Sequence, residues 1–266
     1  RNTPITAGKE PCRRDDDQPM PCATQSHCQP PQVSNVTYTT TVTATNGAVD
    51  NDTRFLPLIR VNRADVNAAL ELWQALSTHK HLQAFTDRII LVEQPIHRSK
   101  ALSMPIAKLA KHIPVIIDES DSTVDSFLQA KELGYTGVSS KTCKGLYKSI
   151  INAARCSMWN KELGEEKYFQ SAEDLTCQAG LAVQQDLALI SLLGITHVER
   201  KGHHYVNGLA GAEEQEQMNF LNTHNALYQT TNGRTCIKIV DGKFSVASLQ
   251  CIGFATSAFP DWSTLD

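Results

Sequence analysis

Three short segments of the sequence end in side chains that can exchange protons with a bound molecule. Glu93 closes an apolar run at 89–92, and Asp118, followed by Glu119, closes a similar run at 113–117. A third run follows one repeat later and ends at Lys141. Barrel enzymes place their chemistry at the C-terminal ends of parallel strands. The pattern therefore predicts acid–base chemistry at one rim of a parallel sheet.

Parallel strands and the helices between them must position these residues. Continuous Val, Ile and Leu runs are typical of strands buried on both faces, as in parallel sheets. Composition and periodicity predict strands at 36–45, 56–61, 89–93, 114–118, 136–141, 175–177 and 195–199. Helices are predicted at 65–77, with Asp65 as the cap, and at 99–111, 122–133, 145–159, 181–193 and 212–228. A β pair of 236–240 with 244–249 is expected near the end of the chain.

The composition favours a globular domain over a nucleic-acid-binding or membrane protein. The 266 residues are 41% hydrophobic and 20% charged, with a formal net charge of −3. Such a chain offers no basic surface to nucleic acid, and it has no apolar run long enough to span a membrane. Several of the eight cysteines lie among predicted core elements, which is typical of a reducing compartment. We therefore expect a cytoplasmic protein.

The N-terminal segment differs from the rest of the chain. Residues 1–35 contain six prolines, the acidic run 15–17 and no apolar periodicity. This composition predicts an irregular or disordered segment. A zinc site built from its cysteines and one histidine is an alternative, although the segment lacks paired Cys-x-x-Cys knuckles (Cys12, Cys22, Cys28 and His27). Residues 36–266 are then expected to form one barrel domain, whose first strands the pattern does not assign.

The strand-end motifs resemble those of a known group of enzymes. Glu-Gln-Pro at 93–95, Asp-Glu-Ser at 118–120 and a lysine ending the next strand are similar to the mandelate racemase and muconate-lactonizing branch of the enolase superfamily. The resemblance covers about residues 56–259. It implies an α/β fold, a partial or complete (β/α)7β barrel of the TIM type. The α+β capping domain that precedes the barrel in this family is not recognisable in residues 1–55.

The resemblance also implies an activity and a set of ligands. Family members abstract a proton from the carbon next to a carboxylate, as racemases, dehydratases or cycloisomerases, with Mg²⁺ as the cofactor and a small carboxylic acid as the substrate. By motif match, Glu93 and Asp118 would be the second and third metal ligands, with Glu119 as a supporting neighbour. Asn62 stands where the family has its first ligand, an aspartate. Lys141 matches the lysine base.

Two further residues are candidates on the opposite side of the rim. Glu199 ends the predicted strand 195–199 and so points to the same rim, where it could polarise the substrate carboxylate or carry a proton. His203 follows in a loop and could act as an acid or as a substrate contact. Surface histidines beside basic residues are an equally ordinary interpretation of that loop.

Two other hypotheses stay open. The first is an inactive or truncated relative, because Asn62 brings no charge to a metal site and no cap is recognisable. An incomplete barrel exposes a strand edge, which favours a homo-oligomer. The second makes Lys141 a Schiff-base nucleophile in an aldolase-type barrel, which would leave Glu93 and Asp118 without a role.

Overall fold

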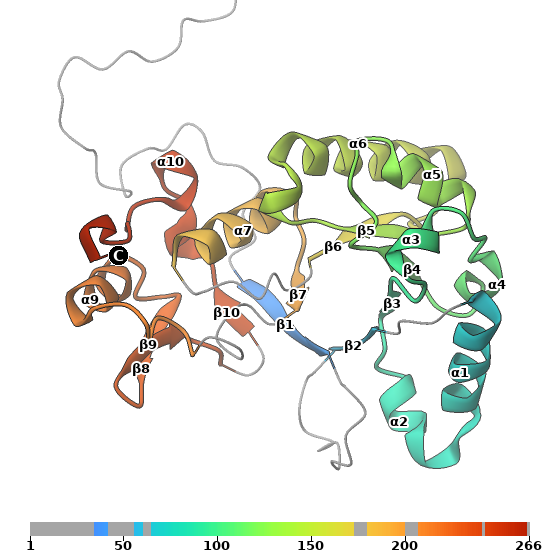
Figure 1. The fold of residues 1–266 in the computed structure, drawn as a ribbon, viewed down its shortest axis with the longest axis horizontal. Helices are drawn as coiled ribbons and strands as arrows, with labels where there is room; N and C mark the ends of the chain where they lie inside the picture. The colour runs from blue at the N-terminus through green and yellow to red at the C-terminus, as the bar shows by residue number, and fades with distance from the viewer. Residues whose placement is uncertain are drawn as a thin grey trace, which may run out of the picture.

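A largely parallel sheet occupies the centre of the molecule (Figure 1). The computed structural model describes residues 35–41, 56–60, 65–172, 180–199, 207–240 and 243–264. The parallel strands are β1 (Asn35–Thr41), β2 (Leu56–Arg60), β3 (Leu91–Glu93), β4 (Val115–Ile117), β5 (Gly137–Ser139), β6 (Phe169–Ser171) and β7 (His197–Glu199). A further strand, β10 (Lys243–Ser245), pairs with β1 in the antiparallel sense.

The strands pair in the order expected of strand–helix repeats. From β1 to β6 each strand lies beside the next one in the chain, and β7 pairs in parallel with β1. Pairing between the first and last strands is a property of barrels. No ladder joins β6 to β7 within residues 169–172 and 180–199. The mixed α/β fold with successive parallel strands is therefore confirmed, and a closed barrel remains a prediction.

The strands that carry the acidic motifs are short and wholly buried. All residues of β3, β4 and β5 are buried, as the apolar runs at β3 and β4 predict. Each lies inside the range predicted for it. β5 begins at Gly137, and the backbone of β6 approaches this residue closely. A Cβ at position 137 would lie 2.9 Å from the carbonyl oxygen of Phe169.

Helices follow most strands. They are α1 (Val66–Thr78), α2 (Gln83–Thr86), α3 (Arg98–Ala101), α4 (Ala107–Ala110), α5 (Ser126–Glu132), α6 (Leu146–Leu163), α7 (Leu181–Leu192), α9 (Glu214–Thr223) and α10 (Ile252–Ala255). Short 3₁₀ turns are η1 (Lys80–Leu82), η2 (Thr142–Lys144), η3 (Ala247–Leu249) and η4 (Trp262–Thr264). Asp65 caps α1 as predicted, accepting the Ala68 N–H at 2.9 Å.

Two predicted elements differ from the structure, and a third lies outside the described residues. The helix expected at 99–111 is two short helices, α3 and α4, because Pro105 lies between them and disfavours helical backbone at Met104. The strand expected at 175–177 lies outside the described residues, and β6 comes earlier. The strand predicted at 236–240 does not pair mainly with 244–249. It is β9 (Arg234–Ile237), which pairs with β8 (Tyr228–Thr231).

The two larger apolar cores of the described residues lie in different parts of the molecule. One packs strands β3 to β5 against α1, α4, α5 and α6 and contains Phe127, Tyr135 and Trp159. The other gathers α7, α9, β8 and β9 around residues such as Leu187 and Phe220. In Figure 1 the α9, β8 and β9 group lies across the molecule from α1 and α4. Among the described residues, no helix is long and apolar enough to cross a membrane.

Candidate active site

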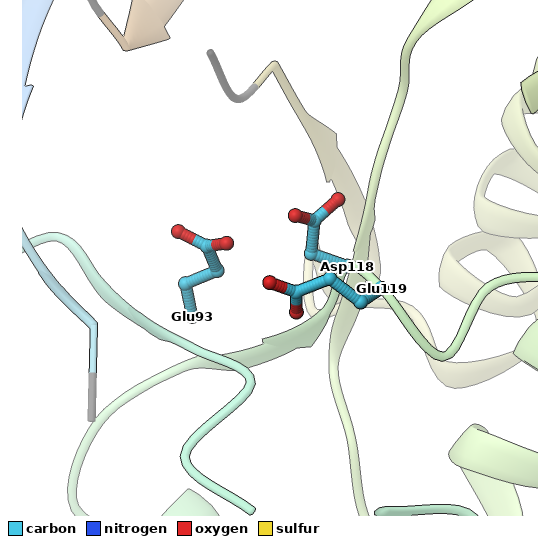
Figure 2. A group of neighbouring side chains, drawn as sticks. All are labelled: Glu93, Asp118 and Glu119. Carbon is cyan, nitrogen blue, oxygen red and sulfur yellow. The ribbon is translucent and has the colours of Figure 1, made fainter. Parts of the chain in front are cut away.

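Three carboxylates meet at the ends of β3 and β4. Glu93 is the last residue of β3, and Asp118 and Glu119 directly follow β4. One oxygen from each of the three lies within 4.8 Å of the other two. Glu93 and Asp118 are 1% and 2% exposed. Figure 2 shows Glu93 across from Asp118 and Glu119, so the structure brings together three of the four residues expected to bind metal.

The donor set of this cluster suits a hard cation. All three groups are carboxylates, two of them are buried, and oxygen ligands from neighbouring strand ends are what Mg²⁺ binds. Burial disfavours ionised carboxylates, and positive charge beside them, from a metal ion or from a lysine, keeps them ionised. The residues present therefore fit a divalent cation in chemical type and in spacing.

Gln94 links the two acidic motifs. Its side-chain Oε1 accepts the backbone N–H of Asp118 at 3.0 Å and that of Ser120 at 2.8 Å. Its backbone adopts a positive φ of 27°, which is uncommon for a residue other than glycine and is found at sites where the surroundings impose it. The Gln of Glu-Gln-Pro thus holds the backbone of Asp-Glu-Ser in place. The motif contained this signal, but sequence reasoning gave Gln94 no role.

Two lysines contact Asp118, one on each carboxylate oxygen. The Nζ of Lys141 lies 2.8 Å from Oδ2, and the Nζ of Lys144 lies 2.7 Å from Oδ1. Burial alone would raise the pKa of Asp118, but the charges and hydrogen bonds of Lys144 and Lys141 hold it well below its ordinary value. Asp118 is therefore a carboxylate that stays ionised inside the protein.

A second buried ion pair lies next to the contacts of Asp118. Lys148, on α6, binds Asp121 with 2.9 Å between Nζ and Oδ2, and both side chains are buried. Lys144 also lies 3.9 Å from the same Asp121 oxygen. Burial lowers the pKa of Lys144, while the charge of Asp118 opposes this shift. Sequence reasoning did not include Asp121 or Lys148, because their spacing resembles an ordinary loop and helix.

The residue after Lys141 is hydrogen-bonded to α7. The Asp186 carboxylate accepts the backbone N–H of Thr142 at 2.7 Å, and its Oδ1 also accepts the Thr142 hydroxyl. Asp186 is 1% exposed, so this contact is shielded from water. The residue next to Lys141 is thereby fixed to a helix that begins 40 residues further along the chain.

Three of the residues predicted for the site are not described at side-chain level. Asn62 and His203 lie outside the described residues. Glu199 ends β7, which pairs with β1 (Thr39 opposite Glu199), and only its backbone is described. Asp65, which lies near Asn62 in sequence, uses its carboxylate to cap α1.

The chain was compared with known proteins. No protein-family model matches the sequence, and no curated protein is similar to it. Several solved structures are similar to the chain. They include a mandelate racemase/muconate lactonizing protein from Paracoccus denitrificans, crystallised with magnesium (14% identity, TM-score 0.41), a muconate lactonizing enzyme from Klebsiella pneumoniae (15%, 0.43) and 2-chloromuconate cycloisomerase from Rhodococcus opacus (15%, 0.43).

The matches cover different shares of the two chains. They span 72%, 71% and 80% of this chain, but 42%, 45% and 60% of the Paracoccus, Klebsiella and Rhodococcus chains. This chain therefore corresponds to less than two thirds of each of the three proteins.

Proposed function

We propose that this chain is a Mg²⁺-dependent enzyme of the mandelate racemase and muconate-lactonizing type, which abstracts a proton next to the carboxylate of a small acid. One observation carries the proposal: the Lys141 ammonium lies 2.8 Å from Asp118 within the cluster that also contains Glu93 and Glu119. A proton-transferring group and three candidate metal ligands thus come from three consecutive strand ends. An ion pair between Lys141 and Asp118 alone would not require Glu93 and Glu119 beside it, whereas a metal site uses them.

The residues have distinct roles in this proposal. Glu93, Asp118 and Glu119 hold the cation, and Asn62 is the proposed fourth oxygen donor. Bound Mg²⁺ supplies positive charge that stabilises the negative charge developing on the substrate carboxylate. Lys141 accepts the substrate proton at Nζ, which requires its neutral form. Its contact with Asp118 stabilises the ammonium, so this arrangement corresponds to the protonated state of the base.

The remaining parts of the proposal rest on the sequence. Glu199 and His203 would contact the substrate or move a second proton, from the side of the rim opposite Lys141. We also propose a cytoplasmic protein with no nucleic-acid or membrane partner, and self-association through an exposed strand edge.

A second candidate is a relative that keeps the fold but binds no metal. It is favoured by the occupation of Asp118, whose two oxygens both contact ammonium groups. A cation that uses Asp118 must compete with at least one of these contacts. The two candidates predict different affinities for Mg²⁺, because only in the enzyme does Asp118 give up a lysine contact to bind the metal.

Solvent isotope exchange tests the proposed function directly. The chain is incubated in D₂O with Mg²⁺ and a panel of small carboxylic acids, and deuterium incorporation next to the carboxylate is followed by NMR. We expect exchange that requires Mg²⁺ and is lost in Lys141→Met. Lys161→Met, at an exposed position on α6, is the matched control and should exchange at the wild-type rate. Exchange that persists in Lys141→Met contradicts the role of Lys141.

Calorimetric titration separates the two candidates. A dissociation constant for Mg²⁺ in the micromolar to low-millimolar range, weakened in Glu93→Gln, supports the metal site. Absence of measurable binding by the wild-type chain supports the relative that binds no metal.

A further inference from the structure

Lys144 lies where a small cation would be bound. Its Nζ donates to the main-chain oxygen of Asp118 at 2.8 Å, to Asp118 Oδ1 at 2.7 Å and to the main-chain oxygen of Ser139 at 3.0 Å. An ammonium group has three N–H donors, so these three acceptors use all of them. A neutral amine has only two. The three oxygens therefore match a positively charged ammonium group.

The acceptors belong to two neighbouring strand ends. Ser139 is the last residue of β5, and Asp118 directly follows β4. One ammonium group therefore joins the ends of both strands. Main-chain carbonyl oxygens arranged around one point are also what binds K⁺ in proteins. Lys144 supplies the equivalent charge from within the chain.

A tight turn brings the Lys144 side chain back to the end of β5, the strand that precedes it. Residues Thr142–Lys144 form the 3₁₀ turn η2, and Gly145 follows with a φ of 106°. This conformation is strained for any residue with a Cβ, and it lets α6 begin immediately after the turn. The Lys144 side chain is 12% exposed, so the turn buries most of its length.

We propose that Lys144 is a positioning residue whose ammonium group acts as a built-in monovalent cation and fixes the Asp118 carboxylate for divalent cation binding. The inference deepens the proposed function and rests on it for the identity of the metal. With Lys144 on Oδ1, the oxygen that can exchange its partner is Oδ2, which Lys141 contacts. Lys144 thus orients the ligand, and Lys141 handles the proton.

The test removes the ammonium group and supplies it again from solution. Lys144→Ala leaves a space that ammonium ion can enter, whereas Lys144→Met fills the space without charge. We expect both variants to lose about 10-fold to 100-fold in Mg²⁺ affinity, the usual effect of removing a group that orients a metal ligand. Ammonium chloride should restore the affinity and the thermal midpoint of Lys144→Ala with a saturable dependence. It should restore neither in Lys144→Met.

Matched controls separate this effect from salt and from general destabilisation. Tetramethylammonium chloride at the same ionic strength is too large for the space and should restore nothing. Phe220→Leu removes buried volume from the other apolar core, away from the carboxylate cluster, so it should lower the thermal midpoint but keep near wild-type Mg²⁺ affinity. If Lys144→Ala does not fold alone, recovery of its circular dichroism spectrum by ammonium becomes the measurement.

The outcomes distinguish this inference from the proposed function. Wild-type or higher Mg²⁺ affinity in Lys144→Met, or equal recovery with ammonium and tetramethylammonium, overturns the role of Lys144. Failure of the wild-type chain to bind Mg²⁺ overturns the proposed metal site. In that case, recovery of the Lys144→Ala thermal midpoint by ammonium still decides whether Lys144 acts as an internal cation.

Discussion

The side-chain oxygen of Gln94 accepts the backbone N–H of Asp118 across two neighbouring strand ends, at 3.0 Å. The same oxygen accepts the N–H of Ser120, and both bonds are buried. The position of the Asp118 backbone therefore depends on a residue in the preceding motif. This relationship ties the second and third proposed metal ligands into one unit, because Gln94 directly follows Glu93.

Replacing Gln94 by methionine should loosen this unit. The two buried N–H groups lose their acceptor, which costs about 1–3 kcal/mol of unfolding free energy for each unsatisfied buried group. Urea unfolding followed by circular dichroism measures the change. Gln94→Glu retains a side-chain oxygen at the same distance from the backbone and serves as the control, with a smaller loss expected. Equal losses in the two variants would show that the acceptor oxygen is not the cause.

Replacing Asp118 by asparagine should leave two buried lysines without their carboxylate. Removing one member of a buried ion pair costs about 3–5 kcal/mol. The pKa of Asp118 is lowered in the folded protein, so its stabilising effect is fully present above its ordinary value of 3.8 and is lost as the pH falls through the lower folded value. The stability difference between wild type and Asp118→Asn should therefore be constant from pH 5 to pH 7 and shrink in strong acid. Urea unfolding across this pH range checks both expectations, and a difference that grows in acid contradicts them.

The contact between Asp186 and Thr142 should matter for proton transfer more than for metal binding. Asp186→Leu removes the acceptor that holds the residue next to Lys141, so the base shifts relative to the substrate. Small misplacements of a reacting group reduce rates by about 10-fold to 100-fold. We expect slower deuterium exchange with Mg²⁺ affinity close to wild type. Asp186→Asn keeps one acceptor oxygen and should lie between the two.

His224 should make the second core sensitive to acid. Its side chain is completely buried, and burial lowers its pKa. The folded protein therefore favours neutral imidazole, whereas the unfolded chain binds a proton near the ordinary value of 6.5. Stability from this source is present above that value and falls as the pH decreases below it.

Thermal midpoints measured between pH 5 and pH 8 test this expectation. His224→Phe should flatten the decline below pH 6.5. His112→Gln, at an exposed position, should leave the decline unchanged. An unchanged pH profile in His224→Phe would assign the acid sensitivity to other groups.

Sequence patterns predicted the strands of the site because burial determines them. Leu91 and Val115 lie in apolar runs typical of strands covered on both faces, and each run ends at an acidic residue. The position of β6 was missed for the same physical reason. Phe169–Ser171 is partly polar, and two of its three residues are only half-buried, so no apolar run marks it.

The contacts within the site were less predictable than the strands. Lys144 was visible in the sequence, but its contact with two carbonyl oxygens depends on the 3₁₀ turn and on the positive φ of Gly145. The Asp186 contact joins segments 44 residues apart, and no local pattern encodes such a pair. The hairpin turn at Asn232 and Gly233, both with positive φ, was a local signal that sequence reasoning overlooked.

The charges around Asp118 have a consequence for the order of binding. Four carboxylates (Glu93, Asp118, Glu119 and Asp121) face three ammonium groups (Lys141, Lys144 and Lys148), so the cluster carries a formal charge of −1. A divalent cation changes this to +1, and a monocarboxylate brings it to zero. Each therefore lowers the electrostatic cost of the other, and by thermodynamic linkage the two must strengthen each other's binding equally. Because the cluster alone is negative while Lys141 is protonated, we expect the cation to bind before the acid.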